Sequence, residues 1–71
     1  MSVLYSVHAR ERMRRRRVGP GDVLAVITTP DELDYGEAGE ILATRRLGRR
    51  RIRVVYFETA TERHIITVIV L

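Results

Sequence analysis

The sequence predicts one α+β domain spanning residues 1–71, in which two N-terminal helices pack on an antiparallel meander sheet of three to four strands. Two observations predict this class. Apolar residues follow a helical period in the first part of the chain, and a period of two from Asp31 onward. Glycine and proline lie between the segments, where turns are expected. A chain of 71 residues is near the lower limit for a core without crosslinks, so every strand has to contribute.

The first helix is predicted over residues 5–17. Ser6 is a good N-cap residue, because its hydroxyl accepts a hydrogen bond from a main-chain amide of the first turn. Tyr5, Ala9 and Met13 fall on one side at the helical period. They form a narrow apolar stripe with arginines along both flanks.

The second helix is predicted to begin at Gly19-Pro20, since proline suits the first helical turn. Asp22 is favourable near the positive end of the helix dipole. Residues 23–27 supply an apolar face, and Thr28-Thr29-Pro30 ends the helix. This helix is interpreted as purely structural.

Four strands are predicted after the helices, at residues 33–35, 40–47, 50–57 and 64–71. Turns at residues 36–39 and 58–62 and a tight turn near Gly48 connect them. Consecutive strands joined by short turns form an antiparallel meander.

The faces of the last two strands follow from their alternation. In the strand over residues 50–57, Ile52, Val54 and Tyr56 share one face, and Arg53 lies on the other. The last strand is apolar on both faces, so we expect it to be central in the sheet. Its two faces are predicted to be Ile66, Val68 and Val70 on one side and Ile65, Thr67, Ile69 and Leu71 on the other. Two helices cover only one face of the sheet, so the other requires burial by its own side chains or by a second protein.

Arginine is the main compositional signal, with thirteen residues and no lysine. Six lie within residues 10–17 and six within residues 45–53, whereas residues 18–44 carry six acidic residues and no arginine. The planar guanidinium binds a phosphate through two hydrogen bonds and stacks on a base. The composition therefore predicts an RNA or DNA partner, provided that the fold brings both blocks onto one surface. The alternative is that the arginines only solvate the surface.

Several classes of protein are not expected. The chain has no cysteine, so it has neither a disulfide nor a thiolate metal site. Its apolar runs, residues 23–27 and 65–71, are too short to cross a bilayer, and residues 1–6 do not resemble a signal peptide. Two histidines and no carboxylate cluster with ligand spacing make a metal or other cofactor unexpected. We expect a cytoplasmic protein.

Short motifs along the chain carry a resemblance to a known family. They are His8-Ala9, Arg12, Arg16, Asp22-Val23, Gly48, Arg53-Val54-Val55-Tyr56 and Ile66-Thr67. In this order, helix, helix and meander, the sequence resembles the RelE/ParE superfamily of small bacterial toxins. It resembles still more a family of short proteins of unknown function assigned to that fold, and residues 45–67 are similar to BrnT-type ribonuclease toxins.

The resemblance implies a ribonuclease site. In RelE-type toxins an arginine of the third strand faces the RNA, and the matching position here is Arg53. Many of these toxins carry a further tyrosine, histidine or arginine after the last strand, whereas this sequence ends at Leu71. That departure removes one candidate catalytic group.

Metal-independent RNA cleavage needs a base, an acid and cations that stabilise the phosphorane. His8 has an ordinary pKa near neutrality and lies among arginines. The predicted catalytic residues are His8, Arg12, Arg53 and Tyr56. The predicted nucleic-acid-binding residues are Arg15, Arg16, Arg45, Arg46, Arg50 and Arg51.

Each catalytic candidate also has a structural interpretation. His8 suits a helix N-terminus, where it bonds to the backbone. Tyr56 alternates with apolar residues and suits a core. Arg53 lies in an apolar strand, where an ion pair with Glu58 or Glu40 would compensate its charge.

Three functions therefore stay open. The first is a RelE-like toxin that cleaves RNA, free or on the ribosome, and is neutralised by an acidic antitoxin. The second is a nucleic-acid-binding module without catalysis. The third is a protein-interaction domain that forms a homodimer through an open strand edge or apolar face.

Overall fold

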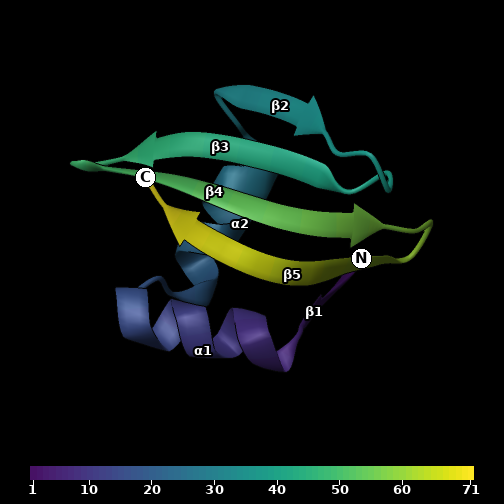
Figure 1. The fold of residues 1–71 in the computed structure, drawn as a ribbon, viewed down its shortest axis with the longest axis horizontal. Helices are drawn as coiled ribbons and strands as arrows, with labels where there is room; N and C mark the ends of the chain where they lie inside the picture. Colours follow the sequence, from purple (N-terminus) through teal and green to yellow (C-terminus); the bar gives the residue numbers. More distant parts are fainter.

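Two helices and five strands make up the fold, and the computed structural model describes all 71 residues (Figure 1). The elements are β1 (Ser2–Tyr5), α1 (Val7–Arg16), α2 (Pro20–Thr28), β2 (Glu32–Tyr35), β3 (Ile41–Leu47), β4 (Arg50–Glu58) and β5 (Glu62–Val70). The predicted class is confirmed: the protein is α+β, with two N-terminal helices packed on one sheet. Neither helix is long and apolar enough to cross a membrane.

The strands lie in the order β1-β5-β4-β3-β2. β2 to β5 form the predicted antiparallel meander, and β5 lies between two strands, as its two apolar faces predict. β1 is an additional edge strand that pairs in parallel with β5, with Ser2 opposite Glu62 and Tyr5 opposite Ile65. The prediction of three to four strands is therefore wrong, because it omits this strand.

The start of α1 depends on one hydroxyl group. The helix begins at Val7, not at Tyr5, because Tyr5 belongs to β1. Ser6 is the N-cap, as predicted, and its Oγ accepts a hydrogen bond from the amide of Ala9 at 3.0 Å. The same hydroxyl donates to the carbonyl of Ile66 at 2.8 Å. Ser6 therefore connects the first turn of α1 to the edge of β5.

A tight turn joins the two helices. Arg17 follows α1 with a φ of 54°, and the amide of Val18 donates to the carbonyl of Met13 at 2.9 Å. A residue in this left-handed conformation is a common way to end a helix. α2 then begins as predicted, and Oδ2 of Asp22 accepts a hydrogen bond from the amide of Gly19 at 2.9 Å.

The core lies between the helices and one face of the sheet. Ile52, Val54 and Tyr56 of β4 all face it, as predicted, and each is at most 4% exposed. The remaining core residues come from both helices, from the turn between them, and from β3 and β5: Ala9, Met13, Val18, Val23, Val26, Ile27, Ala43, Ile65 and Val68.

A bulge in β5 changes which of its residues face the core. The pairing with β4 shifts between Val55 and Tyr56, which leaves Ile66 as an extra residue in β5. Ile65 and Val68 are therefore both buried on the core side. The predicted faces are wrong at this point, because strict alternation would place Ile65 and Val68 on opposite sides.

The other face of the sheet, called here the open face, is covered by no helix (Figure 1). The pairing register and the alternation along the strands place on it Leu42, Arg51, Arg53, Val55, Phe57 and Ile69. Phe57 is 39% exposed and the others are half-buried. Thr44 and Thr67 lie opposite Arg53 and Val55 on the same face. The open face is thus a largely apolar surface with two threonines and with arginines toward one end.

Candidate nucleic-acid interface

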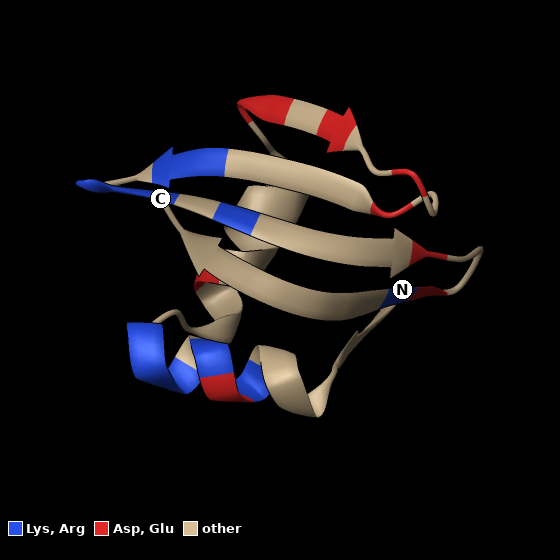
Figure 2. Ribbon diagram, viewed as in Figure 1, with Lys and Arg blue, Asp and Glu red and all other residues tan.

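The two blocks of arginine, which are far apart in the sequence, meet at one end of the molecule (Figure 2). The last turn of α1 lies at the same end as the hairpin between β3 and β4. Most acidic residues lie on β2 and at the turns of the opposite end. The fold therefore converts a charge pattern along the chain into a separation of charge across the molecule.

Arg50 forms the direct link between the two blocks. Its Nη1 donates to the carbonyl of Arg16 at 2.6 Å, and its Nη2 donates to the carbonyl of Arg17 at 3.0 Å. Nη2 also lies 3.9 Å from Oδ2 of Asp22. The last carbonyls of a helix lack partners within the helix and carry partial negative charge, so a guanidinium is well suited to them. Arg50 thus holds the hairpin between β3 and β4 against the end of α1. This contact brings the other arginines of both blocks to the same end of the molecule.

Six arginines form the surface that we call the arginine end. All are exposed, and none of their guanidinium groups has a hydrogen bond or an ion pair within the protein. The main-chain amide of Arg46 donates to Oδ2 of Asp31 at 2.9 Å. Three of them, Arg15, Arg16 and Arg46, are predicted nucleic-acid-binding residues. The complete set is Arg14, Arg15, Arg16, Arg17, Arg46 and Arg49. Like charges collected on one surface, with no carboxylate paired to their guanidinium groups, create a positive field that attracts a polyanion.

Three predicted binding residues are engaged within the protein instead. Besides Arg50, Arg45 donates through Nη1 to the carbonyl of Ala25 near the end of α2, at 3.1 Å. Arg51 donates through Nη2 to Oε1 of Glu32 on β2, at 2.9 Å. These three side chains lie at the same end of the molecule as the arginine end, with their guanidinium groups bonded within the protein.

Arg53 lies on the open face, and its partner is a hydroxyl group. Its Nε donates to Oγ1 of Thr44 at 2.9 Å, and Thr44 is only 2% exposed. The two carboxylates that the sequence offers as partners of Arg53 form other contacts. Glu58 pairs with Arg63, and Glu40 accepts a hydrogen bond from the amide of Ala38. The bond through Nε orients the guanidinium and leaves both Nη groups of Arg53 without a protein partner.

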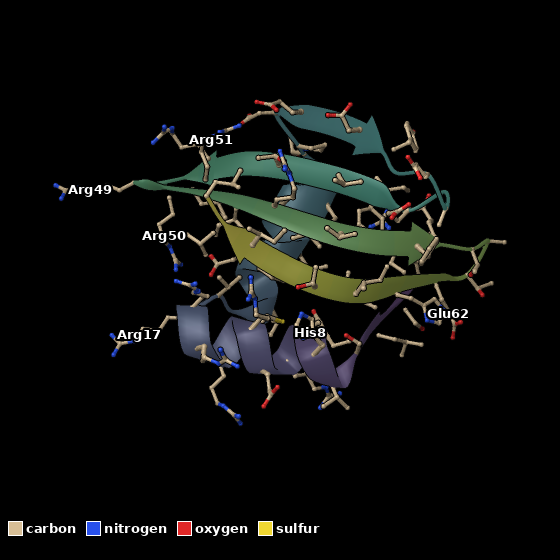
Figure 3. All side chains as sticks on the ribbon, viewed as in Figure 1. His8, Arg17, Arg49, Arg50, Arg51 and Glu62 are labelled. Atoms are coloured by element: carbon tan, nitrogen blue, oxygen red, sulfur yellow. The ribbon has the colours of Figure 1, made fainter.

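His8 is separated from the arginine end along α1. It lies near the start of the helix, whereas Arg17 lies beyond its other end (Figure 3). His8 and Arg16 are eight positions apart in the helix, a distance of about 12 Å along its axis. Arg12, one turn after His8, is half-buried and donates through Nε to the carbonyl of Val68 on β5 at 3.4 Å. Among the predicted catalytic residues, only His8 and Arg12 are neighbours in this helix.

Tyr56 is a core residue. It is 4% exposed and lies on the opposite face of the sheet from Arg53. Burial raises the pKa of its phenol, and the nearby charge of Glu58 adds to this. The phenol therefore stays protonated at neutral pH and lies away from the open face. The structural interpretation of Tyr56 is the one that the fold supports.

The arginine end includes three residues that the predicted binding set omits. Arg14 and Arg17 belong to the last turn of α1 and its C-cap, and Arg49 lies in the turn after Gly48. Their positions in the predicted elements could have identified them, because side chains at a helix end and at a hairpin turn project away from the core. The number of arginines in a block does not distinguish these free side chains from one such as Arg45, which is bonded within the protein.

Comparison with known proteins gives one match. No curated protein and no solved structure matches the chain. Residues 5–70, from the last residue of β1 to the end of β5, match the family described as "Domain of unknown function (DUF4258)". This match covers both helices and the whole meander, so the chain belongs to the DUF4258 family.

Proposed function

We propose that this protein binds RNA and that the arginine end is the surface that contacts the phosphates. The observation that carries the proposal is the contact of Arg50 with Arg16 and Arg17, since it joins the two arginine blocks into one surface. Ten of the thirteen arginines form no ion pair; the exceptions are Arg50, Arg51 and Arg63. Such a surface is suited to a polyanion.

The resemblance to RelE-like toxins favours RNA over DNA as the partner. It also supports a finer proposal, in which the protein is the toxin of a toxin-antitoxin pair. An acidic antitoxin segment would bind the same arginine end, because its charge is complementary, and would exclude RNA from it.

The binding of a fluorescent single-stranded RNA, followed by anisotropy from about 50 to 300 mM salt, tests the proposal. If all six arginines of the arginine end contact phosphates, log Kd changes with log salt with a slope of magnitude about 4. Arg49→Gln is expected to reduce this magnitude by about 0.7, the value for one phosphate contact on a single strand.

Arg63→Gln is the matched control, because it removes the same charge at the far end of β4 and β5, where Arg63 pairs with Glu58. We expect its salt dependence to equal that of the wild type. Absence of RNA binding at low salt, or equal losses in both variants, would contradict the proposal.

RNA cleavage is a second candidate function, and the orientation of Arg53 favours it. Nε of Arg53 is held by Thr44, so both Nη groups are available for a phosphate on the open face. His8 and Arg12 lie on α1, which packs against the other face of the sheet, so Arg53 alone carries this candidate function. Incubation of RNA, and of ribosomes, with the wild type and with Arg53→Ala tests cleavage. Equal products from both proteins would exclude Arg53 as a catalytic residue.

A further inference from the structure

The largest cavity lies on the flank of α1 away from His8 and Arg12. It has a volume of about 430 Å³ and opens to solvent. Six residues line it, from the end of β1, one flank of α1 and the turn into α2: Tyr5, Arg10, Met13, Arg14, Val18 and Pro20. A volume of this size falls in the range of about 300 to 1,000 Å³ that is common for small-ligand sites.

The lining combines apolar surface with two cations. Met13 and Val18 are buried members of the core, and Tyr5 is half-buried. Arg10 and Arg14 are exposed, and they lie one turn apart on the same side of α1. None of the six lining residues is acidic. The chemistry therefore suits a ligand with a flat, weakly polar part and a negative charge next to it.

An unpaired nucleotide has this chemistry. Its base stacks on an aromatic ring such as that of Tyr5, and its phosphate accepts hydrogen bonds from two guanidinium groups. Arg14 belongs both to the pocket and to the arginine end. A strand held by Arg14 at the arginine end is therefore within reach of the pocket.

We infer that this pocket receives one unstacked base of the bound RNA, with the flanking phosphate held by Arg10 and Arg14. The inference rests on the proposed RNA binding and adds a subsite to it. The subsite shares Arg14 with the arginine end, and its aromatic residue, Tyr5, comes from β1.

The test compares a uridine tetranucleotide with an abasic oligomer that has the same number of phosphates. Met13 is one of only two methionines, so its labelled methyl group gives an assignable NMR signal inside the pocket. We expect the tetranucleotide to shift this signal and to bind about tenfold more tightly than the abasic oligomer, as stacking of one base predicts. The abasic oligomer should bind without shifting Met13.

Tyr5→Leu removes the aromatic ring and keeps an apolar side chain. It is expected to lower the tenfold preference for the base to about twofold or less, since the stacking partner is lost. Tyr35→Leu is the matched control, because Tyr35 is 69% exposed on β2 and does not line the pocket. The control should keep the full preference, and thermal unfolding verifies that both variants fold.

The outcomes separate the two proposals. Equal binding of both oligomers, or an unshifted Met13, would overturn the pocket inference and leave RNA binding intact. Failure of both oligomers to bind would overturn RNA binding itself, and the inference with it. A shift of Met13 by an acidic peptide with leucine side chains, but not by RNA, would assign the pocket to a protein partner and overturn the inference.

Discussion

Nη1 of Arg50 lies 2.6 Å from the carbonyl oxygen of Arg16, the last residue of α1. This contact joins the start of β4 to the end of a helix that lies 34 positions earlier in the sequence. It explains why side chains from both arginine blocks share one end of the protein despite their mutual repulsion. The carbonyls at the end of α1 compensate the charge of Arg50.

Arg50→Ala is therefore expected to destabilise the protein. The loss of two charge-assisted hydrogen bonds to the helix end should lower the free energy of unfolding by about 1 to 2 kcal/mol. Urea unfolding measures this change. Arg49→Ala is the control, since Arg49 is exposed and unpaired, and its effect should stay within about 0.5 kcal/mol. Equal effects in the two variants would show that the link between hairpin and helix contributes nothing.

Ser6→Ala should also destabilise the fold, because it removes both the N-cap bond to Ala9 and the bond to Ile66. We expect a loss of about 1 to 2 kcal/mol in urea unfolding. Ser2→Ala removes a hydroxyl from exposed Ser2 of β1 and should have little effect. If Ser6→Ala were as stable as Ser2→Ala, the proposed connection between α1 and β5 would be wrong.

Thr44→Val tests the orientation of Arg53. The valine keeps the shape of the buried side chain but removes Oγ1, so Nε of Arg53 loses its partner. Stability should fall by about 1 kcal/mol, and any activity that depends on Arg53 should fall as well. Thr44→Ser retains the hydroxyl and should retain that activity. Equal activity of the two variants would show that the hydroxyl does not position Arg53.

Glu32→Gln should strengthen RNA binding. It removes the carboxylate that pairs with Arg51 and leaves that guanidinium free for a phosphate. Because the ion pair is exposed, stability should change by less than about 1 kcal/mol. Asp34→Asn removes an equal charge from the same strand, where no ion pair is formed. Anisotropy should show a larger gain in affinity for Glu32→Gln than for Asp34→Asn, and equal gains would indicate a general charge effect.

The raised pKa of Tyr56 predicts a loss of stability at alkaline pH. In the unfolded chain the phenol ionises near its ordinary pKa of 10.0, whereas burial keeps it protonated to higher pH in the folded protein. Its contribution to stability is therefore fully present below pH 10.0 and is lost as the pH rises through the folded pKa. Urea unfolding at a series of alkaline pH values should show a steeper fall for the wild type than for Tyr56→Phe. Tyr35→Phe removes only the smallest of the contributions that raise the pKa of Tyr56, so it should stay much closer to the wild type than Tyr56→Phe.

Local sequence signals predict much of this fold correctly. Ser6 as an N-cap and Pro20 in the first turn of α2 follow from the chemistry of helix ends. The alternation of Ile52, Val54 and Tyr56 identifies the core face of β4, because successive side chains of a strand point to opposite sides. These features depend on neighbouring residues only, so the sequence contains what is needed to predict them.

Other features depend on contacts between distant segments. β1 becomes a strand because it pairs with the start of β5 at the other end of the chain, and the bulge at Ile66 arises in the pairing of β5 with β4. Neither leaves a periodic signal in its own residues. The prediction therefore begins α1 too early and assigns Ile65 to the wrong face.

The candidate site also combines features that the sequence predicts with features that depend on contacts between distant segments. The amino-acid sequence by itself determined that arginine occurs in two blocks, that an acidic segment separates them, and that Arg53 and Tyr56 lie on opposite faces of one strand. Only the tertiary structure decided that the blocks meet, that Arg45, Arg50 and Arg51 are used within the protein, and that Arg14, Arg17 and Arg49 are free. The physical reason is that the availability of a guanidinium depends on which acceptors the fold brings within hydrogen-bond distance, and these acceptors lie far away in the chain.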